Sequence, residues 1–273
     1  MKLPLFIIDA FTDRPLSGNP AAVCPLEEWL PADQMQAIAA EMNLSETVFF
    51  APATGTVQRG GSDHGAISYD VRWFTPTREV DMIGHATLAA GHLALDRLAP
   101  EHEAARFLSP TAEITVSRHG EALRMNMPAL VPQPVDPPAG MEAALGARPA
   151  RVLAAKHYLA VYEDVATVAA LRPDFAAVSA LDLPAVIVTA PADAAGFDFV
   201  SRFFAPANGV PEDSVSGVAH CCLAPYWAAR LGKAATVGRQ LSRRGGTVRC
   251  EVAGERVWLA GEAAVFLEGT ITL

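Results

Sequence analysis

Arg72-Trp73-Phe74-Thr75-Pro76 and Arg202-Phe203-Phe204-Ala205-Pro206 share one pattern, in which an arginine and two aromatic residues precede a proline. Each stretch is followed by a glutamate and, five residues later, by a glycine that opens an apolar segment. These residues are Glu79 and Gly84 in the first stretch, and Glu212 and Gly217 in the second. The shared spacing favours an internal duplication over chance similarity between short apolar segments.

Hydrophobic periodicity predicts the elements around these stretches. Helices over residues 84–98 and 217–231 are expected to be buried, because apolar residues surround their axes. A helix over residues 32–42 carries its apolar residues on one side, and residues 67–73 alternate as in a half-buried strand. The expected fold class is α+β, with two pseudo-symmetric domains. Each would be a curved, mostly antiparallel sheet wrapped around a central buried helix.

The predicted halves are residues 1–118 and 119–261, and the last strand, residues 262–273, is expected to return to the first half. Each buried helix would begin at a glycine, Gly84 or Gly217, with free backbone N–H groups at its N-terminus. If the halves face each other, the two N-termini would meet across one cleft. Such a cleft favours an anion, for example a carboxylate or a developing enolate.

The composition argues against several classes of protein. The chain has 273 residues, of which 51% are hydrophobic and 19% charged, so it is not a disordered chain. Its formal net charge of -9 disfavours nucleic acid as the main partner. No apolar run is long enough to span a membrane, and no secretory signal is recognised. We therefore expect a cytoplasmic protein that does not bind membranes.

The cysteines and histidines do not suggest a metal site. None of the four cysteines forms a C-x-x-C pair, and we expect reduced, mostly buried thiols. They are Cys24, Cys221, Cys222 and Cys250. His85 and His92 lie about two helical turns apart, which makes shared ligation of a metal unfavourable.

Several motifs occur in order along the chain. They are Gly18-Asn19-Pro20-Ala21-Ala22-Val23, Asn43-Leu44-Ser45-Glu46-Thr47, Phe74-Thr75-Pro76 with Gly84-His85-Ala86-Thr87, and Pro211-Glu212-Asp213 with Gly217. With these motifs the chain resembles the PhzF family of phenazine biosynthesis-like isomerases over essentially its whole length. That family is related in fold to diaminopimelate epimerase and proline racemase. The resemblance implies a cofactor-independent homodimer that isomerises a small carboxylate-bearing molecule by acid/base chemistry between its two halves.

The resemblance gives Glu46 the main catalytic role, as a general acid/base that moves a proton between carbons. Such chemistry needs a base close to the carbon and a place for the resulting charge. A glutamate at the edge of a partly apolar cleft can have a raised pKa, which is useful in both directions. Without the motif, Glu46 would be interpreted as a surface residue that follows a helix.

The resemblance implies roles for eight further residues. His85 would assist proton transfer or bind substrate, and Asp213 would hold or polarise substrate from the second half. The structural alternatives are that His85 satisfies the start of its helix and that Asp213 interacts with a helix dipole. The substrate-binding candidates are Asn19, Ser45, Gly84, Ser216, Gly217 and Val218. Asn19 and Ser45 are the weaker candidates, because turn asparagines and loop hydroxyls are usually structural.

The second motif departs from the family pattern at three positions. Ser214 stands where the family has proline, Ser216 where threonine is usual, and Val218 where serine is usual. A valine cannot offer a hydroxyl group to a substrate. A different substrate, a less polar pocket or a reduced activity would follow. The alternative function is a non-catalytic small-anion binding protein on the same fold.

Two other mechanisms are disfavoured. Related racemases use a cysteine at the start of each buried helix, and the corresponding positions here are Ile83 and Ser216. Cys221 and Cys222 lie about one turn inside the second helix. A serine or cysteine hydrolase is disfavoured because the chain has no G-x-S-x-G elbow. A serine and a histidine four residues apart, as Ser216 and His220 are, usually occur together by coincidence. A mechanism in which one carboxylate both removes and returns the proton predicts a proton shift on one face of the substrate.

Overall fold

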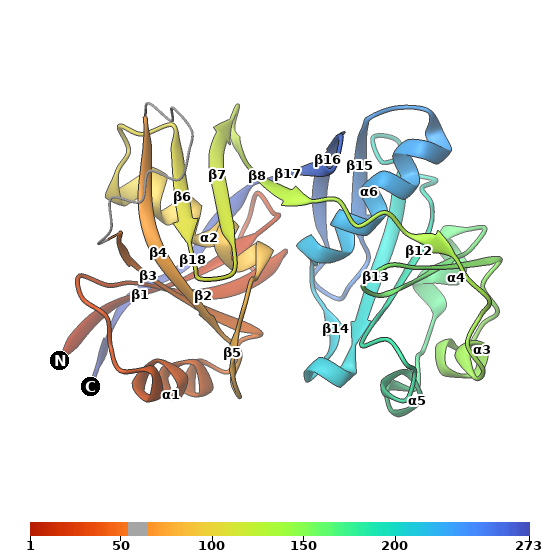
Figure 1. Cartoon of the computed structure of the whole chain (residues 1–273), viewed down its shortest axis with the longest axis horizontal. Coiled ribbons are helices and arrows are strands. Elements are labelled where there is room, and N and C mark those ends of the chain that lie inside the picture. The colour runs from red at the N-terminus through yellow and green to blue at the C-terminus, as the bar shows by residue number, and fades with distance from the viewer. Residues whose placement is uncertain (54–64) are drawn as a thin grey trace. The chain divides into compact units, whose positions relative to one another are not determined.

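The computed structural model describes residues 1–53 and 65–273, which form two compact units (Figure 1). Unit 1 comprises Met1–Asn126 and Ala260–Leu273, and unit 2 comprises Met127–Leu259. Strands β7 (Glu113–His119) and β8 (Ala122–Pro128) form an antiparallel hairpin near the end of the first segment of unit 1. None of the helices in the described ranges is long and apolar enough to cross a membrane.

Unit 1 contains strands that surround one helix, α2, and a second helix outside them. Its elements are β1 (Lys2–Ala10), β2 (Asn19–Pro25), α1 (Ala32–Met42), β3 (Glu46–Pro52), β4 (Ala66–Phe74), β5 (Glu79–Val80), α2 (Gly84–Leu93), a π-helical turn (Ala94–Leu98), β6 (Ala104–Leu108), β7, β8 and β18 (Ala263–Thr272). Helix α1 has the predicted bounds. Helix α2 ends at Leu93 instead of Leu98, because the last five residues of the predicted helix form the π-helical turn.

Unit 2 repeats this arrangement around α6. Its elements are β9 (Gln133–Pro134), α3 (Met141–Leu145), β10 (Arg151–Ala154), β11 (Tyr158–Val161), α4 (Val165–Ala170), α5 (Phe175–Ser179), β12 (Val186–Pro191), β13 (Phe199–Ala205), a 3-10 turn (Pro206–Asn208), β14 (Val210–Asp213), α6 (Gly217–Leu231), β15 (Ala235–Gln240), β16 (Gly246–Ala253) and β17 (Arg256–Gly261), which ends in unit 1. The bounds of α6 agree with the prediction.

The same series of strand pairings occurs in both units. The pairs β2–β3 and β11–β12 are parallel, and the pairs β3–β4 and β12–β13 are antiparallel. The pairs β4–β6 and β13–β15 are again parallel, and β6–β7 and β15–β16 are antiparallel. Each buried helix follows a short strand, β5 or β14. This agreement of topology supports the internal duplication inferred from the sequence.

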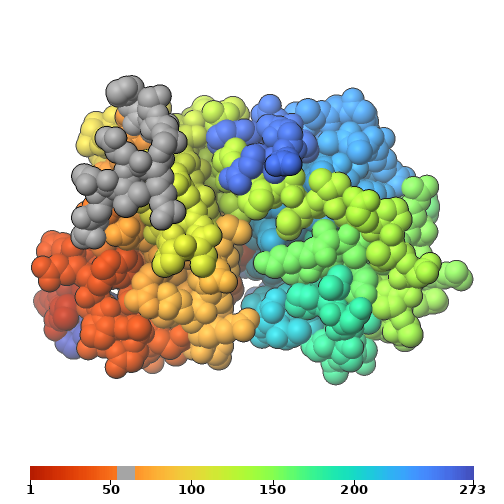
Figure 2. Space-filling view, viewed as in Figure 1, coloured from red at the N-terminus to blue at the C-terminus, as the bar shows by residue number. Residues whose placement is uncertain are grey.

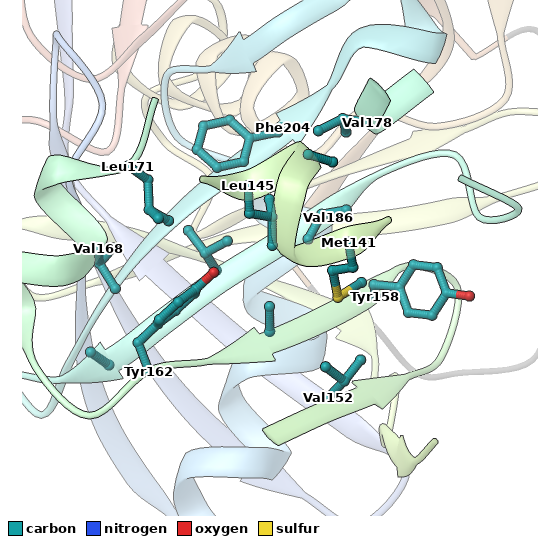
Figure 3. Packing of buried hydrophobic residues seen from close by; sticks show 14 of the residues in the cluster. Met141, Leu145, Val152, Tyr158, Tyr162, Val168, Leu171, Val178, Val186 and Phe204 are labelled. Carbon is teal, nitrogen blue, oxygen red and sulfur yellow. The ribbon is translucent and has the colours of Figure 1, made fainter. Parts of the chain in front are cut away.

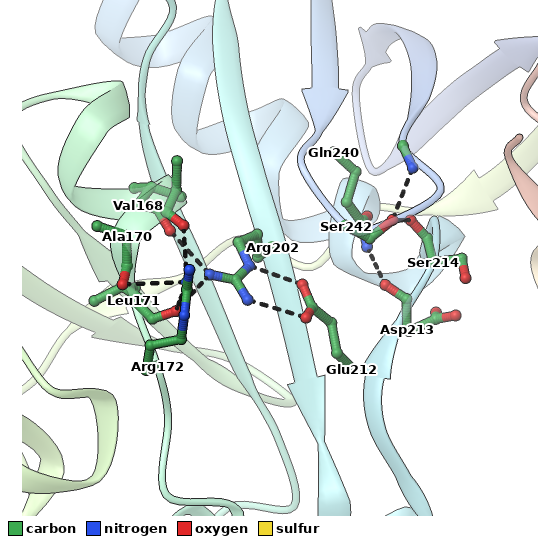
Figure 4. Close-up of polar contacts among 12 residues, drawn as sticks. Val168, Ala170, Leu171, Arg172, Arg202, Glu212, Asp213, Ser214, Gln240 and Ser242 are labelled. Carbon is green, nitrogen blue, oxygen red and sulfur yellow. Dashed lines mark hydrogen bonds and ion pairs between the residues drawn. The ribbon is translucent and has the colours of Figure 1, made fainter.

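The arginine and glutamate of the repeated stretches form the same ion pair in each unit. Arg72 donates to both carboxylate oxygens of Glu79, each at 2.6 Å. Arg202 donates to those of Glu212 at 2.7 and 3.0 Å (Figure 4). Arg202 also donates to carbonyl oxygens at the end of α4. Bidentate pairs fix geometry as well as charge, so each one ties a long strand to the segment before the buried helix.

Helix α2 is buried on almost every side, as its sequence predicts. Leu88, Ala89 and Ala90 are fully buried, and β7 crosses so close that Gly91 has no room for a side chain. A Cβ at Gly91 would lie 2.5 Å from Cγ1 of Val116. The glycine therefore allows the helix and the strand to approach closely.

Alternate residues of the unit 2 strands enter two different apolar clusters. Val186 and Val188 of β12 pack with residues of α3, α4 and α5 such as Leu145 and Val168 (Figure 3). Ile187, between them in sequence, packs on the opposite face with residues of α6. This alternation is the two-residue period of a strand buried on both faces.

The two ends of the chain lie side by side in unit 1. Strand β18 pairs antiparallel with β1 along its length, and the N-terminal amine of Met1 donates to the carbonyl of Leu273 at 2.5 Å. Figure 2 shows the blue C-terminal residues against the red N-terminal ones. The last strand therefore completes the sheet that the first strand begins.

Candidate active site

Glu46 and His85 meet inside unit 1. Glu46 is the first residue of β3, where Ala21 of β2 is its register partner, and His85 is the second residue of α2. Nε2 of His85 lies 3.1 Å from Oε2 of Glu46, and the two side chains are 4% and 10% exposed. A carboxylate and an imidazole at this distance can share or transfer a proton.

The environment of Glu46 contains two opposing influences on its pKa. Burial raises the pKa, because it disfavours the charged form. The nearby charge of His85 and the Ser45 hydroxyl act in the opposite direction, and the net result is a pKa below the ordinary value for glutamate. A raised pKa, which burial alone would favour, is not found for Glu46, because the imidazole outweighs burial.

The N-terminus of α2 is arranged around this pair. Its N-cap residue, Ile83, has extended backbone geometry and supplies no side-chain cap to the first turn. The hydroxyl of Thr87 donates to the carbonyl of Ile83 at 2.6 Å and accepts from Nε1 of Trp73 at 3.0 Å. The buried Trp73 of β4 thereby fixes the first turn of the helix. The positive end of the helix dipole lies at the residue that carries the imidazole.

The remaining candidate site residues of unit 1 lie next to Glu46 and His85 in the chain or in a neighbouring strand. Ser45 directly precedes β3, and Gly84 is the first residue of α2. Asn19 is buried at the start of β2, opposite Ala10 of β1. It follows Gly18, whose φ of 65° suits glycine and whose hypothetical Cβ would lie 2.2 Å from the Ala10 carbonyl oxygen. The tight turn between β1 and β2 therefore determines the position of Asn19.

In unit 2, Asp213 ends β14 and Ser216 is the N-cap of α6. The Ser216 hydroxyl accepts the backbone N–H of Ala219 at 3.3 Å, so it caps the helix that begins at Gly217. This capping role explains a serine at this position without any ligand. Asp213 has polar partners within the described structure, which is compatible with the structural alternative for it.

Two residues that the sequence interpretation did not identify hold this loop. The side-chain amide of Gln240 donates to the carbonyl of Asp213 at 2.7 Å and accepts the backbone N–H of Ser216 at 3.0 Å. Ser242 donates to the carbonyl of Ser214 at 2.6 Å (Figure 4). They come from β15 and the loop after it, and no local sequence signal connects them with the loop before α6.

Strand register identifies the position in unit 2 that corresponds to Glu46. Phe74 and Phe204 occupy matching places in the repeated stretches, and they face Thr47 and Val186 across their strand pairs. The residue before Thr47 is the site glutamate, whereas the residue before Val186 is Ala185. The second unit therefore has no carboxyl group at the corresponding position.

The position that corresponds to His85 is Val218, because each residue follows the glycine that opens its helix. Ala185 and Val218 belong to one apolar cluster with Leu223 and Trp227 of α6. Where unit 1 has a carboxylate facing an imidazole, unit 2 has two apolar side chains. Among the described residues, the repeat thus carries this acid/base pair once.

The structure places no thiol at the two helix starts. Ile83 and Ser216 are the N-caps of α2 and α6. All four cysteines are buried free thiols, as expected. Burial raises the pKa of Cys24, Cys221 and Cys222 to about 12, which keeps them protonated and unreactive. A two-thiol mechanism has no residues to perform it at these positions.

His220 does not form a nucleophile pair with Ser216. Its Nδ1 donates to the backbone carbonyl of Ser216 at 2.7 Å, and complete burial lowers its pKa to about 4. The histidine is therefore a neutral side chain within α6. In the described part of the chain, His, Cys, Asp and Glu side chains form no group of three that could hold a metal ion.

Comparisons with known proteins agree with this arrangement. The sequence model of the phenazine biosynthesis-like protein family matches residues 8–269. An uncharacterized isomerase of Pseudomonas aeruginosa is 46% identical, and the human phenazine biosynthesis-like domain-containing protein is 35% identical, each over the full length of both chains. A crystal structure of a PhzF family protein from Enterococcus faecalis is similar with a TM-score of 0.92 at 40% identity, again with complete coverage of both chains.

More distant similarity extends to the epimerases. A hydroxyproline epimerase from Agrobacterium vitis has a TM-score of 0.61 at 10% identity, which is a similarity of fold alone. The two repeated units and these relatives define an isomerase with an epimerase-like α+β fold. Within that class, the chain belongs to the phenazine biosynthesis-like, or PhzF, family, as its motifs predict.

Proposed function

We propose that this isomerase moves a proton between carbons of a small carboxylate-bearing metabolite without a cofactor, with Glu46 as general acid/base. The observation that carries the proposal is the buried contact between Glu46 and His85 at the N-terminus of α2. Family membership supports the class of reaction, and the geometry supports the choice of the base.

In the proposed reaction the ionised Glu46 takes a proton from a carbon of the substrate next to its carboxylate. The C–H bond breaks, an O–H bond forms on Glu46, and the electron pair moves to the substrate oxygens. The N-terminus of α2 favours this negative charge. His85 holds the carboxylate in place. Glu46 then returns the proton to a different carbon of the delocalised anion, which requires a substrate with a carbon–carbon double bond conjugated to the developing enolate. A single carboxylate can do both steps on one face of the substrate.

The lowered pKa of Glu46 supports this order of events. An ionised carboxylate is ready to act as a base at neutral pH. When the proton reaches Glu46, the ion pair with His85 is lost while burial remains, which favours return of the proton. The same contact therefore keeps the base charged before reaction and makes the protonated carboxyl a better acid afterwards.

Further residues of the expected site are also proposed to contribute. Asp213 would contribute to substrate binding, as would Asn19, Ser45 and Ser216 with the helix glycines. Val218 would present an apolar surface, because its side chain lies with the apolar cluster of α6. A homodimer is proposed from the resemblance alone, and a cytoplasmic location from the sequence features alone.

The test is solvent deuterium incorporation, followed by NMR with a panel of small amino and hydroxy acids. Wild type should exchange a carbon-bound hydrogen of at least one compound. Glu46→Gln should reduce that rate by about 10²- to 10⁴-fold. The matched control is Glu41→Gln, on the exposed side of α1. Equal exchange by wild type and Glu46→Gln would remove Glu46 from its role.

A binding protein without catalysis is the second candidate, and the apolar pair Ala185 and Val218 is the observation in its favour. It predicts calorimetric binding of a small carboxylate with no deuterium incorporation at any carbon. Binding together with exchange would exclude it. Binding alone, retained in Glu46→Gln, would replace the catalytic proposal.

A further inference from the structure

Arg72 and Arg202 occupy matching places in the two units, but they differ in what the third guanidinium nitrogen contacts. Nη1 of Arg202 donates to the carbonyl oxygens of Val168 and Leu171 at 3.1 and 2.9 Å, at the end of α4 (Figure 4). Both hydrogen bonds of Arg72 come from Nε and Nη2 and go to Glu79, so Nη1 has no acceptor among the residues that the structure describes. The side chain of Arg72 is 29% exposed, against 10% for Arg202. The duplication therefore leaves one guanidinium donor of unit 1 open to a ligand.

A pocket of about 490 Å³ lies beside Arg72, lined by residues of β4 and β6, by Trp29 and by the turn at residues 109–112 between β6 and β7. Arg72 lies on the face of β4 turned away from α2, because side chains alternate along a strand and Trp73 binds α2 on the other face. The lining side chains include Trp29, Asp70, Arg72, Arg106, Leu108 and Glu113. Small-molecule sites have volumes of about 300–1,000 Å³, so this pocket has room for a metabolite.

Arg106 of β6 brings a second open donor to the pocket. Its Nε and Nη2 both donate to Oε1 of Glu113, at 3.0 and 2.8 Å. Within the described part of the chain, Nη1 of Arg106 has no acceptor and Oε2 of Glu113 receives no hydrogen bond. A guanidinium group can only donate and a carboxylate can only accept. The pocket therefore offers a ligand two guanidinium donors, from Arg72 and Arg106, and one carboxylate acceptor.

Trp29 adds a flat aromatic surface to these polar groups. It follows β2 as α4 follows β11, and its ring centre lies 6.0 Å from Cζ of Arg72. The turn on the other side of the pocket is held by its own hydrogen bonds. The Ser109 N–H donates to the Ala112 carbonyl at 2.8 Å, and the Ser109 hydroxyl accepts the Ala112 N–H at 3.0 Å. A turn that is already ordered reduces the entropy cost of binding.

The charges around the pocket favour a neutral ligand. Each guanidinium has a glutamate oxygen at 2.6 or 2.8 Å, and Asp70 adds a further negative charge. The acceptors that Arg202 holds in unit 2 are likewise neutral carbonyl oxygens. A hydroxyl group both donates and accepts, so a ring with several hydroxyls can use Arg72, Arg106 and Glu113 together.

We propose that this pocket of unit 1 binds a neutral polyhydroxylated ring, that is, a monosaccharide. One face of the ring lies against Trp29. Its hydroxyl oxygens accept from Nη1 of Arg72 and Arg106, and one hydroxyl donates to Oε2 of Glu113. The site binds its ligand without a covalent step. This inference does not depend on the reaction proposed above, because none of these residues takes part in that reaction.

The first test titrates the wild-type protein with glucose, galactose and N-acetylglucosamine and follows the indole N–H groups by proton–nitrogen correlation NMR. Trp29→Phe identifies the resonance of Trp29. At least one of the sugars should shift it, with a dissociation constant in the millimolar range, as a ligand of about a dozen non-hydrogen atoms allows. The resonances of the buried Trp73 and Trp227 should stay in place. Glucuronate and glucosamine carry a negative and a positive charge on the same ring, and both should bind more weakly than glucose.

The second test uses variants and saturation-transfer difference NMR of the sugar. Trp29→Ala should weaken binding by about 2- to 10-fold through loss of the aromatic surface. Arg106→Lys keeps the charge beside Glu113 but removes the free guanidinium donor, and should also weaken binding by about 2- to 10-fold. The matched controls are Phe175→Ala in α5, where the exposure is similar to that of Trp29, and Arg97→Lys in the π-helical turn. Both controls should bind as wild type does, and thermal unfolding verifies that all four variants are folded.

Three outcomes would overturn the proposal. The first is a Trp29 resonance that none of the neutral sugars shifts at about 100 mM, far above a millimolar dissociation constant. The second is tighter binding of glucuronate or glucosamine than of glucose, since the pocket would then select a charge. The third is equal binding by Trp29→Ala, Arg106→Lys and wild type, which would place the sugar elsewhere. A shift of Trp29 by a neutral sugar, with binding weakened in these two variants and retained in both controls, would establish the site.

Discussion

Glu46 illustrates how one neighbour can reverse the effect of burial. A carboxyl in this position without a partner would have a raised pKa, but His85 at 3.1 Å holds it below the ordinary value. Because the folded-state pKa is lowered, ionised Glu46 contributes stability above its ordinary unfolded pKa of about 4.3. That contribution is lost as the pH falls through the folded-state pKa.

Replacement of His85 should therefore move the titration of Glu46. In His85→Gln the opposing charge is gone while burial remains, so the pKa of Glu46 should rise above its value in wild type. Carbon-13 NMR of labelled glutamate, titrated in both proteins, measures the change. The acidic limb of the deuterium exchange rate should move to higher pH in the same direction.

His119→Gln is the control for that titration, since His119 is exposed at the end of β7. It should leave the pKa of Glu46 at the wild-type value. A pKa that stays the same or falls in His85→Gln would show that the imidazole is not the dominant partner of the carboxylate.

At the scale of elements, the loop before α6 depends on a side chain from a distant strand. Gln240 is fully buried, and its amide satisfies both the Asp213 carbonyl and the Ser216 N–H. Loops before helices are usually held by local caps, and here Ser216 supplies such a cap as well. The hydrogen bonds of Gln240 therefore hold the loop from β15, a strand outside the loop's own segment.

Gln240→Leu should destabilise the protein by about 1–3 kcal/mol for each backbone group that it leaves without a partner. Leucine has a similar volume, so the loss reports mainly on the hydrogen bonds. Urea unfolding of the variant measures the change in free energy. Gln133→Leu, at an exposed position in β9, should remain close to wild type. An equally small effect of both substitutions would contradict a stabilising role of the Gln240 hydrogen bonds.

Helix α2 and strand β7 provide a second prediction about elements. Gly91→Ala should destabilise the fold by about 1–3 kcal/mol through overpacking against Val116, although alanine is the better helix former by about 1 kcal/mol. The double variant with Val116→Ala should recover part of the overpacking cost. The measurement is a double-mutant cycle of unfolding free energies, and a stabilised Gly91→Ala would show that the strand can move away.

At the scale of the whole molecule, both units keep their thiols inside. Cys24 lies in the core of unit 1, while Cys221, Cys222 and Cys250 lie in unit 2. Burial raises all four pKa values, and no pair of them is bonded. The same burial that removes them from racemase chemistry also protects them from oxidation.

The native protein should therefore react slowly with Ellman's reagent and release about four equivalents of thiolate only in denaturant. Partial unfolding of one unit would give an intermediate number, so the stoichiometry also reports whether the units unfold together. Rapid reaction of any thiol under native conditions would contradict the burial described for it.

The sequence alone determined the class of fold and the family. The repeated arginine, proline and glycine spacing indicated two similar halves, and apolar periodicity located α1, α6 and the start of α2. These features are local, because backbone conformation and burial patterns repeat every two or 3.6 residues. The family motifs also identified Glu46 and His85 before any distance between them was known.

Tertiary structure alone decided how those residues act. The pairing of Glu46 with His85, the direction of the pKa shift and the tie from Gln240 all join segments that lie far apart in the chain. Local patterns carry no information about such contacts, because a pKa depends on neighbours that only folding brings together.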